Sequence, residues 1–336
     1  MRYLSSLMLL IAQVVAAQSF FVKSNVQKCF PRTVPPGNYS GITYLGGDKY
    51  AVVSDKSGSD GFYTFRIKVD SLSGEILNVE NLGFNDLGTN YSDIEGIAYN
   101  DKSGRIYLCS EKAGKIIEYD YFRKEKTGNE LALSEYYPEQ KGNGGIESVS
   151  YNSSTDKIWT INEMPISKDD TGTSKYKLRI NSFDSSFCHS ATYAYEMDSY
   201  ENKNNPYMHV EGVSELAALD DGRLLVLERV FHVPQLKIGA YCICRVYLVN
   251  PQKSICISNE QIQDSEKAFM QKEKLCEWKT KLSLFKHKIA NFEGMCLGPK
   301  LADGKQILLF VSDSQNQYHG ILKDWFKSVI ISPAND

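Results

Sequence analysis

The stretch Asp93-Ile94-Glu95-Gly96-Ile97-Ala98-Tyr99, followed by Ile106-Tyr107-Leu108-Cys109-Ser110-Glu111, shows the pattern that decides the fold. An acid and a glycine open an apolar strand, turn residues follow, and a second apolar strand ends at an acid. Such a pair of strands with turn formers between them is typical of a β-hairpin. Four further segments repeat the pattern. They open near Ser40, Glu147, Glu211 and Glu293, and they close at Asp55, Glu163, Glu228 and Asp313.

A third apolar strand follows most of these hairpins, at residues 62–69, 115–121, 177–183 and 245–249. Repeated units of this kind predict an all-β fold and favour a β-propeller over a sandwich. Residues 293–336 and 18–39 together have the length of one more unit, so we expect five blades, with the ring closed by the N- and C-terminal segments. Six blades are the alternative, because the long interval between Glu211 and Glu293 could hold a degenerate blade. We expect instead a Cys-containing insertion at about 250–281, with a solvated helix over 261–281.

The start of the chain is typical of a secretory signal peptide. A positive residue precedes the apolar run 4–15, and small residues around Ala17 fit a cleavage site, which gives a signal peptide at 1–17 and a single propeller domain at 18–336. No later segment is long and apolar enough to cross a bilayer. We therefore expect a secreted or extracellular protein, periplasmic if the host is bacterial.

Overall composition excludes some partners. The 38 Lys and Arg residues against 41 Asp and Glu residues give a net charge of −3, so there is no basic surplus for nucleic acid. We expect a monomer whose partner is a small ester or phosphoester, or another extracellular ligand.

Export would also affect the eight cysteines and the glycosylation sequons. In an oxidising compartment we expect disulfides, with at least two of Cys242, Cys244, Cys256 and Cys276 oxidised. Three sequons make the protein a candidate glycoprotein. Their asparagines are Asn38, Asn90 and Asn152.

The repeated acids carry the functional prediction, because the start of one hairpin strand and the end of the next lie at the same rim. Two rings of residues should therefore meet at one mouth of the propeller. The inner ring contains Ser40, Glu95, Glu147, Glu211 and Glu293, and the second ring contains Asp55, Glu111, Glu163, Glu228 and Asp313.

So many carboxylates around one axis repel each other unless protons or a cation are present. Their hard oxygen atoms suit Ca²⁺, and we expect an axial calcium ion held by the inner ring. The alternative is a latch in which each glutamate hydrogen-bonds to backbone amides of the next blade.

Other chemical signatures are weaker. The G-x-S-x-G and H-E-x-x-H motifs are absent, which argues against familiar serine hydrolases and zinc proteases. Glu111, Glu163, Glu228 and Arg229 remain as candidate catalytic residues. Arg229 could hold an anionic substrate group, although pairing with a ring carboxylate is the simpler role. His209 and His232 flank the fourth repeat and could reach the mouth.

The ordered motifs resemble those of the phytase-like (esterase-like activity of phytase) family over about residues 36–330. The more specific pieces are Leu225-Val226-Leu227-Glu228-Arg229 and Asn291-Phe292-Glu293-Gly294. The resemblance implies a secreted β-propeller that acts on ester or phosphoester bonds. The chain departs from the pattern at Ser148, where the family has glycine.

Two functions remain open from the sequence. One is a Ca²⁺-dependent hydrolase of phosphate or other esters, in which a bound water is the nucleophile. The other is a non-catalytic binding propeller whose calcium is structural, which the scarcity of basic residues near the mouth motifs favours.

Overall fold

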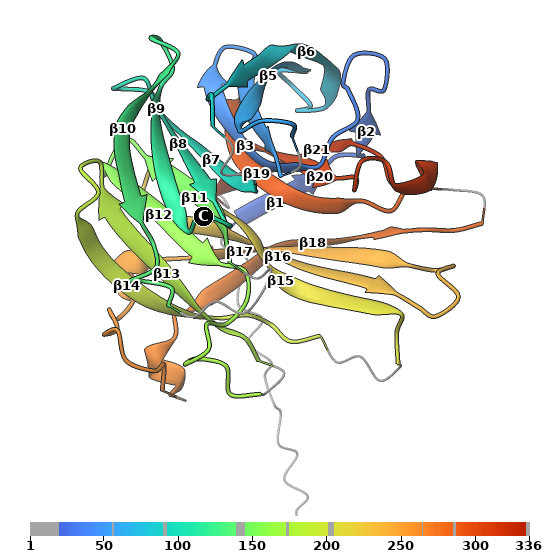
Figure 1. Ribbon diagram of the computed structural model, residues 1–336. Helices are drawn as coiled ribbons and strands as arrows, with labels where there is room; N and C mark the ends of the chain where they lie inside the picture. The colour runs from blue at the N-terminus through green and yellow to red at the C-terminus, as the bar shows by residue number, and fades with distance from the viewer. Residues whose placement is uncertain are drawn as a thin grey trace, which may run out of the picture.

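The computed structural model describes residues 20–333 except 56, 90–92, 139–144, 173–174, 201–204, 264 and 285–286. Its strands form five antiparallel sheets set around one axis (Figure 1). Blade 1 contains β3 (Tyr39–Gly46), β4 (Lys49–Ser54), β5 (Gly61–Val69) and β6 (Ile76–Asp86). Blade 2 contains β7 (Ile94–Asn100), β8 (Arg105–Ser110), β9 (Lys115–Asp120) and β10 (Glu125–Ala132). Blade 3 contains β11 (Ile146–Asn152), β12 (Lys157–Asn162), β13 (Lys177–Asp184) and β14 (His189–Glu196).

The last two blades contain the remaining strands. Blade 4 contains β15 (Met208–Ala218), β16 (Leu224–Val233), β17 (Tyr241–Val249) and β18 (Lys272–Lys281). Blade 5 contains β19 (Asn291–Lys300), β20 (Gln306–Asp313), β21 (Trp325–Pro333) and β1 (Phe20–Ser24), and β2 (Lys28–Cys29) also pairs with β21. The pairing of β1 with β21 confirms that both chain ends complete one blade. The five-bladed prediction is therefore right, and the six-bladed alternative is wrong.

Apolar side chains fill the space between each pair of successive blades. Blades 1 and 2, for example, share a buried cluster that includes Val53, Phe62, Ile97 and Leu108. Corresponding clusters lie between blades 2 and 3, 3 and 4, 4 and 5, and 5 and 1. The second strand of each blade, such as β8 and β12, is almost wholly buried on both faces, so its apolar run follows from contact with two neighbouring blades, whereas outer strands such as β10 are largely exposed. The ring is held closed by these five interfaces.

The expected helix over 261–281 is not formed, because Lys272–Lys281 is the outer strand β18 of blade 4. The insertion is thus confined to the connection between β17 and β18. Within it the described residues contain two short 3-10 helices, Pro251–Lys253 and Glu266–Ala268, and a third, Tyr318–Gly320, follows β20.

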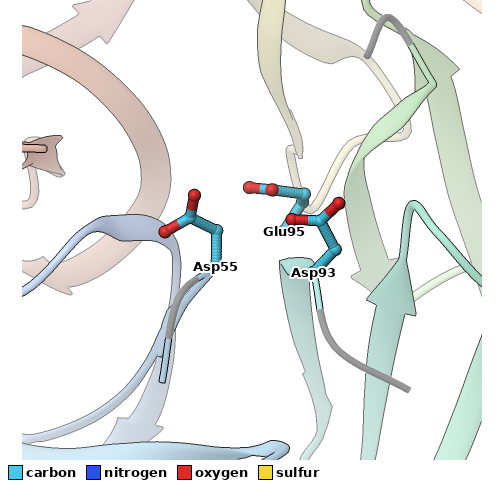
Figure 2. A group of neighbouring side chains, drawn as sticks. All are labelled: Asp55, Asp93 and Glu95. Atoms are coloured by element: carbon cyan, nitrogen blue, oxygen red, sulfur yellow. The ribbon is translucent and has the colours of Figure 1, made fainter. Parts of the chain in front are cut away.

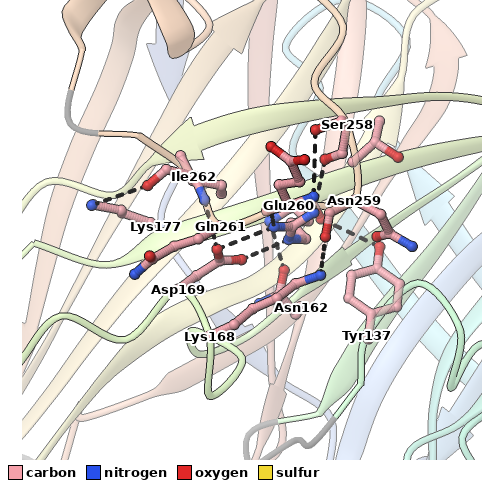
Figure 3. Close-up of polar contacts among 12 residues, drawn as sticks. Tyr137, Asn162, Lys168, Asp169, Lys177, Ser258, Asn259, Glu260, Gln261 and Ile262 are labelled. Atoms are coloured by element: carbon pink, nitrogen blue, oxygen red, sulfur yellow. Dashed lines mark hydrogen bonds and ion pairs between the residues drawn. The ribbon is translucent and has the colours of Figure 1, made fainter.

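That connection crosses to blade 3 and is held by a buried arginine. Arg179 on β13 forms an ion pair with Asp169, 2.6 Å between Nε and Oδ2, and neither side chain is exposed. The guanidinium also donates to the carbonyl oxygens of Ser258 and Glu260, while the Ile262 amide donates to Asp169 at 2.9 Å (Figure 3). Because a buried guanidinium needs partners for its donors, the insertion completes the hydrogen bonding of blade 3.

All eight cysteines are free thiols in the structure, contrary to the disulfide prediction. Cys242 and Cys244 both lie on β17 with their Sγ atoms 3.8 Å apart, whereas a disulfide bond is about 2.05 Å long. Cys276 lies on β18, so three of the four clustered cysteines belong to regular strands and do not staple a loop. Their spacing follows from strand packing.

The expected signal peptide at 1–17 lies outside the described residues. Among the described residues, no helix is long and apolar enough to cross a membrane.

Candidate functional site

A β-bulge interrupts each inner strand at the same end of the channel. In blades 2, 3 and 5 the bulged residue is the expected glutamate: Ile94 pairs with Ser110 and Gly96 with Cys109, which leaves Glu95 unpaired between them. The same shift occurs at Glu147 and at Glu293, and in blade 1 it includes Ser40. A bulge re-aims a side chain, and here it turns the ring residues toward the mouth.

The glycine after the ring residue is explained by close approach of the next blade. A Cβ atom on Gly41 would lie 2.5 Å from the Glu95 carbonyl oxygen, and one on Gly96 would lie 2.7 Å from the Val149 nitrogen. One on Gly294 would lie 2.9 Å from the Ser40 carbonyl oxygen. In blades 1, 2 and 5 the glycine therefore permits close packing at the axis, whereas blades 3 and 4 have Ser148 and Glu215 at this position.

Blade 4 departs from the register that its sequence suggests. Its bulge lies between Val213 and Glu215, so the ring residue is Ser214 and not Glu211. Val213, the residue before the bulge, pairs with Glu228. The second-ring position lies one residue after that partner, so it belongs to Arg229 and not to Glu228. The expectation for both glutamates is wrong because the sequence Glu211-Gly212-Val213 imitates the repeat three residues too early. Blade 4 thus brings a serine to the inner ring, as blade 1 does with Ser40, and it alone brings an arginine to the second ring, where the other blades bring carboxylates.

Glu211 and Glu228 have other surroundings. Glu228, 1% exposed, accepts hydrogen bonds from the Tyr195 hydroxyl at 2.6 Å and from Lys272 Nζ at 2.7 Å. Glu211 is part of the outer portion of β15, where it accepts from the Tyr200 amide at 3.3 Å. Neither carboxylate belongs to the ring.

Arg229 neutralises one side of the mouth. Its guanidinium donates to Glu163 at 2.5 Å, to Glu293 at 2.7 Å and to Asn291 Oδ1 at 2.9 Å. Burial acts to lower the pKa of Arg229, but the nearby carboxylates of Glu293, Glu163 and Glu147 hold it above its ordinary value. Arg229 is thus the pairing partner of ring carboxylates and is already engaged.

Three carboxylates gather on the other side, between blades 1 and 2. One oxygen each from Asp55, Asp93 and Glu95 lie within 4.8 Å of one another, and Figure 2 shows the three groups facing each other. Asp93 was not among the predicted ring residues, although it is the first residue of the quoted motif. It adopts a left-handed backbone conformation, with φ of 66°, which few non-glycine residues adopt but which aspartate and asparagine tolerate best.

Glu95 lies deepest in this cluster. It is 7% exposed, and no hydrogen bond or ion pair joins its carboxylate to any residue that the structure describes. Burial, followed by the charges of Asp55, Glu293 and Asp93, raises the pKa of Glu95 well above its ordinary value. Glu147 behaves in the same way, with burial and then Glu163 and Glu95 raising its pKa. A buried carboxylate without a partner is costly unless it takes up a proton or a cation.

Glu111 lies next to the cluster and reaches the next blade. Its carboxylate accepts a hydrogen bond from the Gly145 amide at 2.5 Å. Burial raises the pKa of Glu111 to about 7, against the effect of this hydrogen bond and with the help of Asp93. Ser40 and Ser214 form latches of a different kind, because their hydroxyls donate to the carbonyl oxygens of Ile94 and Phe292. Among the described residues, the predicted latch of a glutamate on a backbone amide of the next blade is therefore formed by Glu111 of the second ring, and not by Glu95 or Glu147.

Asp313 also lies at the rim, 2% exposed, and accepts from the Gln315 amide at 2.6 Å. Beside it, Asn38 is 3% exposed and its side chain accepts from the Asn316 amide. Asn152 is equally buried and donates to the Leu219 carbonyl oxygen. Burial of these two amides is incompatible with attached glycans, so the glycosylation prediction is wrong at both. Asn90 lies outside the described residues.

Apolar side chains close the channel beneath the acidic ring. Each inner strand contributes one residue two positions after its ring residue: Ile42, Ile97, Val149, Leu216 and Met295, all at most 2% exposed. The opposite end opens as a separate funnel of ≈ 260 Å³ lined by Tyr44, Tyr99 and Tyr151 among others. The acidic mouth is therefore accessible from one end of the channel and is separated from the opposite funnel by this apolar layer.

The donors at this mouth define the ligand class it can hold. Asp55, Asp93 and Glu95 offer only carboxylate oxygens, which are ligands for hard cations such as Ca²⁺ and Mg²⁺. The Glu95 carboxylate, which has no hydrogen-bond partner within the described part of the chain, fits such an ion. The molecule is thus a five-bladed β-propeller with a carboxylate-lined mouth that carries one internal arginine.

A family model described as phytase-like, esterase-like activity of phytase, matches residues 34–315. The chain therefore belongs to the phytase-like family, as its motifs indicate. No curated protein sequence matches it.

Among solved structures, the chain is similar to a luciferin-regenerating enzyme (10% identity, 90% of this chain and 94% of that chain covered, TM-score 0.42). It is also similar to Kuenenia stuttgartiensis hydrazine synthase (10% identity, 87% and 81% covered, TM-score 0.38). A third is streptogramin B lyase (11% identity, 93% and 98% covered, TM-score 0.37). Similarity at this level carries no inference about chemistry.

Proposed function

We propose that this protein is a divalent-cation-dependent hydrolase of small esters or phosphoesters, with calcium as the expected ion and the acidic mouth as its site. The observation that carries the proposal is the convergence of Asp55, Asp93 and Glu95 from two blades, with Glu95 buried and its carboxylate hydrogen-bonded to none of the described residues. The proposed ion therefore lies between blades 1 and 2, whereas the sequence led us to expect an ion on the propeller axis.

Each residue at the mouth has a separate role in this proposal. Asp55, Asp93 and Glu95 hold the ion, which when bound would polarise the oxygen of the scissile ester. Glu111, which lies beside Asp93 in the ring, accepts a proton from the attacking water. Arg229 keeps Glu163 and Glu293 in place and so positions the far side of the mouth.

The charge of the mouth limits the substrate. Since Arg229 already has two carboxylate partners, it offers little to an anionic group, and the remaining ring acids repel polyanions. We therefore expect neutral esters or phosphate diesters to be better substrates than a heavily phosphorylated compound. The same observation favours a second function, a binding propeller in which the ion is structural.

One experiment separates the two functions. Purified full-length chain is assayed against carboxylesters, phosphate monoesters and phosphate diesters, with calcium and with a chelator, and melting is followed in parallel. Hydrolysis that requires calcium and is lost in Glu111→Gln, while calcium still raises the melting temperature of that variant, supports the hydrolase. Calcium-dependent melting without hydrolysis of any ester supports the binding propeller. If calcium affects neither hydrolysis nor melting, both proposed functions are contradicted.

A further inference from the structure

A second cluster of metal-ligand side chains lies outside the acidic ring, on the part of blade 4 that extends beyond the mouth. His209 on β15 and His232 on β16 are directly paired across the two strands. Side chains opposite each other on one face of an antiparallel pair are held close together. His209 precedes the ring residue Ser214 by five positions, so the pair is about 16 Å along the strand from the ring.

The two imidazoles face each other through the same ring nitrogen. The Nδ1 atom of His209 is 3.3 Å from the Nδ1 atom of His232. Two nitrogen ligands at the usual Zn–N distance of about 2.0–2.1 Å and a tetrahedral angle are about 3.3 Å apart. The separation in the protein is thus that of two ligands of one tetrahedral ion, with the ion slightly off the line joining them.

The outer side of His209 has the partner that metal-bound histidines usually have. Glu211 Oε2 lies 3.8 Å from His209 Nε2, on the nitrogen that does not face His232. This distance is too long for a direct hydrogen bond, but the negative charge of a carboxylate on this side favours the orientation in which Nδ1 is the ligand atom and increases the basicity of the imidazole. Glu211, which is not part of the acidic ring, is thus assigned to this histidine pair.

The surroundings keep the pair ordered and neutral. His232 is 6% exposed and stacks on Tyr241 with ring centres 4.8 Å apart, while His209 stacks on Tyr200 at 6.0 Å. The hydroxyls of these two tyrosines are hydrogen-bonded to each other at 2.8 Å. Burial lowers the pKa of both histidines, and His209 and Lys279 lower that of His232 further. Neutral imidazole is the form that binds a metal.

We propose that His209 and His232 form a binding site for a borderline divalent transition-metal ion, Zn²⁺ being the probe, with Glu211 as the positioning residue of His209. Imidazole nitrogen favours such ions over calcium, so this site and the carboxylate cluster take different metals. The remaining coordination positions are open to water or to a ligand, because the protein offers two nitrogens. This inference does not depend on hydrolysis at the mouth.

The test is calorimetric titration of the purified full-length chain with Zn²⁺ in excess calcium, which occupies carboxylate sites. We expect one equivalent of Zn²⁺ to bind, with at least tenfold weaker binding in His209→Gln and about tenfold weaker binding in Glu211→Gln. Glu95→Gln is the matched control and should bind Zn²⁺ like the unaltered chain. Binding should also weaken on acidification, since protons compete with the metal for the imidazole nitrogens.

Two results would overturn the proposal. One is the absence of saturable Zn²⁺ binding, in which case the histidine pair has a structural role. The other is Zn²⁺ affinity that is unchanged in a folded His209→Gln variant, which would place the ion elsewhere, for example on the Cys242 and Cys244 thiols. His209 is chosen for the variant because it is the less buried partner. Visible absorption of bound Co²⁺ provides a second measurement of nitrogen ligation if the variant is unstable.

Discussion

Replacing Arg229 by methionine tests the charge balance of the mouth. The guanidinium is the common partner of Glu163 and Glu293, and the three side chains are 8%, 5% and 13% exposed. Methionine fills much of the same volume but leaves two buried carboxylates uncompensated. Removing one partner from a buried ion pair costs about 3–5 kcal/mol, and we expect a loss of this size in the free energy of unfolding.

The assay is chemical denaturation at pH 7.5 in chelator, followed by tryptophan fluorescence. The combined variant Arg229→Met, Glu163→Gln, Glu293→Gln is the matched control, because it removes the whole charged group. Replacing a complete buried ion-pair network by neutral groups is often close to neutral, so most of the lost stability should return. The loss in Arg229→Met should also shrink at about pH 5, where the freed carboxylates take up protons more readily.

This account of the mouth would be refuted by either of two results. A loss of less than about 1 kcal/mol in Arg229→Met would mean that solvent already screens these pairs, as it does for exposed ones. A combined variant no more stable than Arg229→Met would mean that the arginine stabilises blade 4 through packing rather than through charge.

Further predictions concern the ion, the pH dependence of stability, the buried Arg179–Asp169 pair and the thiols. Chelator should lower the melting temperature of the unaltered chain, whereas in Glu95→Gln calcium should change it little; an equal calcium effect in both proteins would contradict the proposed ligand set. Because the folded-state pKa of Glu95 is raised, the folded chain binds more protons than the unfolded one above pH 4.5, so without metal stability should fall as the pH rises from there. Melting in chelator at pH 5.5 and 7.5 checks this sign, and saturating calcium should reduce the difference. Arg179→Met should destabilise the chain by about 3–5 kcal/mol and expose the 250–271 connection to proteolysis, whereas Asp169→Asn with Arg179→Met should recover part of that stability. Cys242 and Cys244 should react with a thiol reagent only after unfolding, and mass mapping of the native protein should find no bond between them.

The sequence by itself determined the blades of this protein. Apolar runs separated by turn residues specify hairpins through local rules, and the count of units with the two half-units at the ends specifies five blades closed by both termini. The glycine after Glu95 and Glu293 was visible as a pattern, but its reason, the amide or carbonyl of the next blade at 2.7–2.9 Å from the missing Cβ, is a property of the closed ring.

Tertiary structure alone decided which acids share the mouth. In blade 4 the sequence carries two overlapping fits to the repeat, and the bulge selects Ser214 and Arg229 over Glu211 and Glu228. A shift of one residue in a strand turns a side chain to the other face, so a pattern read by eye cannot fix which carboxylate points inward. Asp93 joins Asp55 only because two blades meet there, and His209 meets His232 only because their strands pair. Sequence sets the local strands, while contacts between residues far apart in the chain set the chemistry.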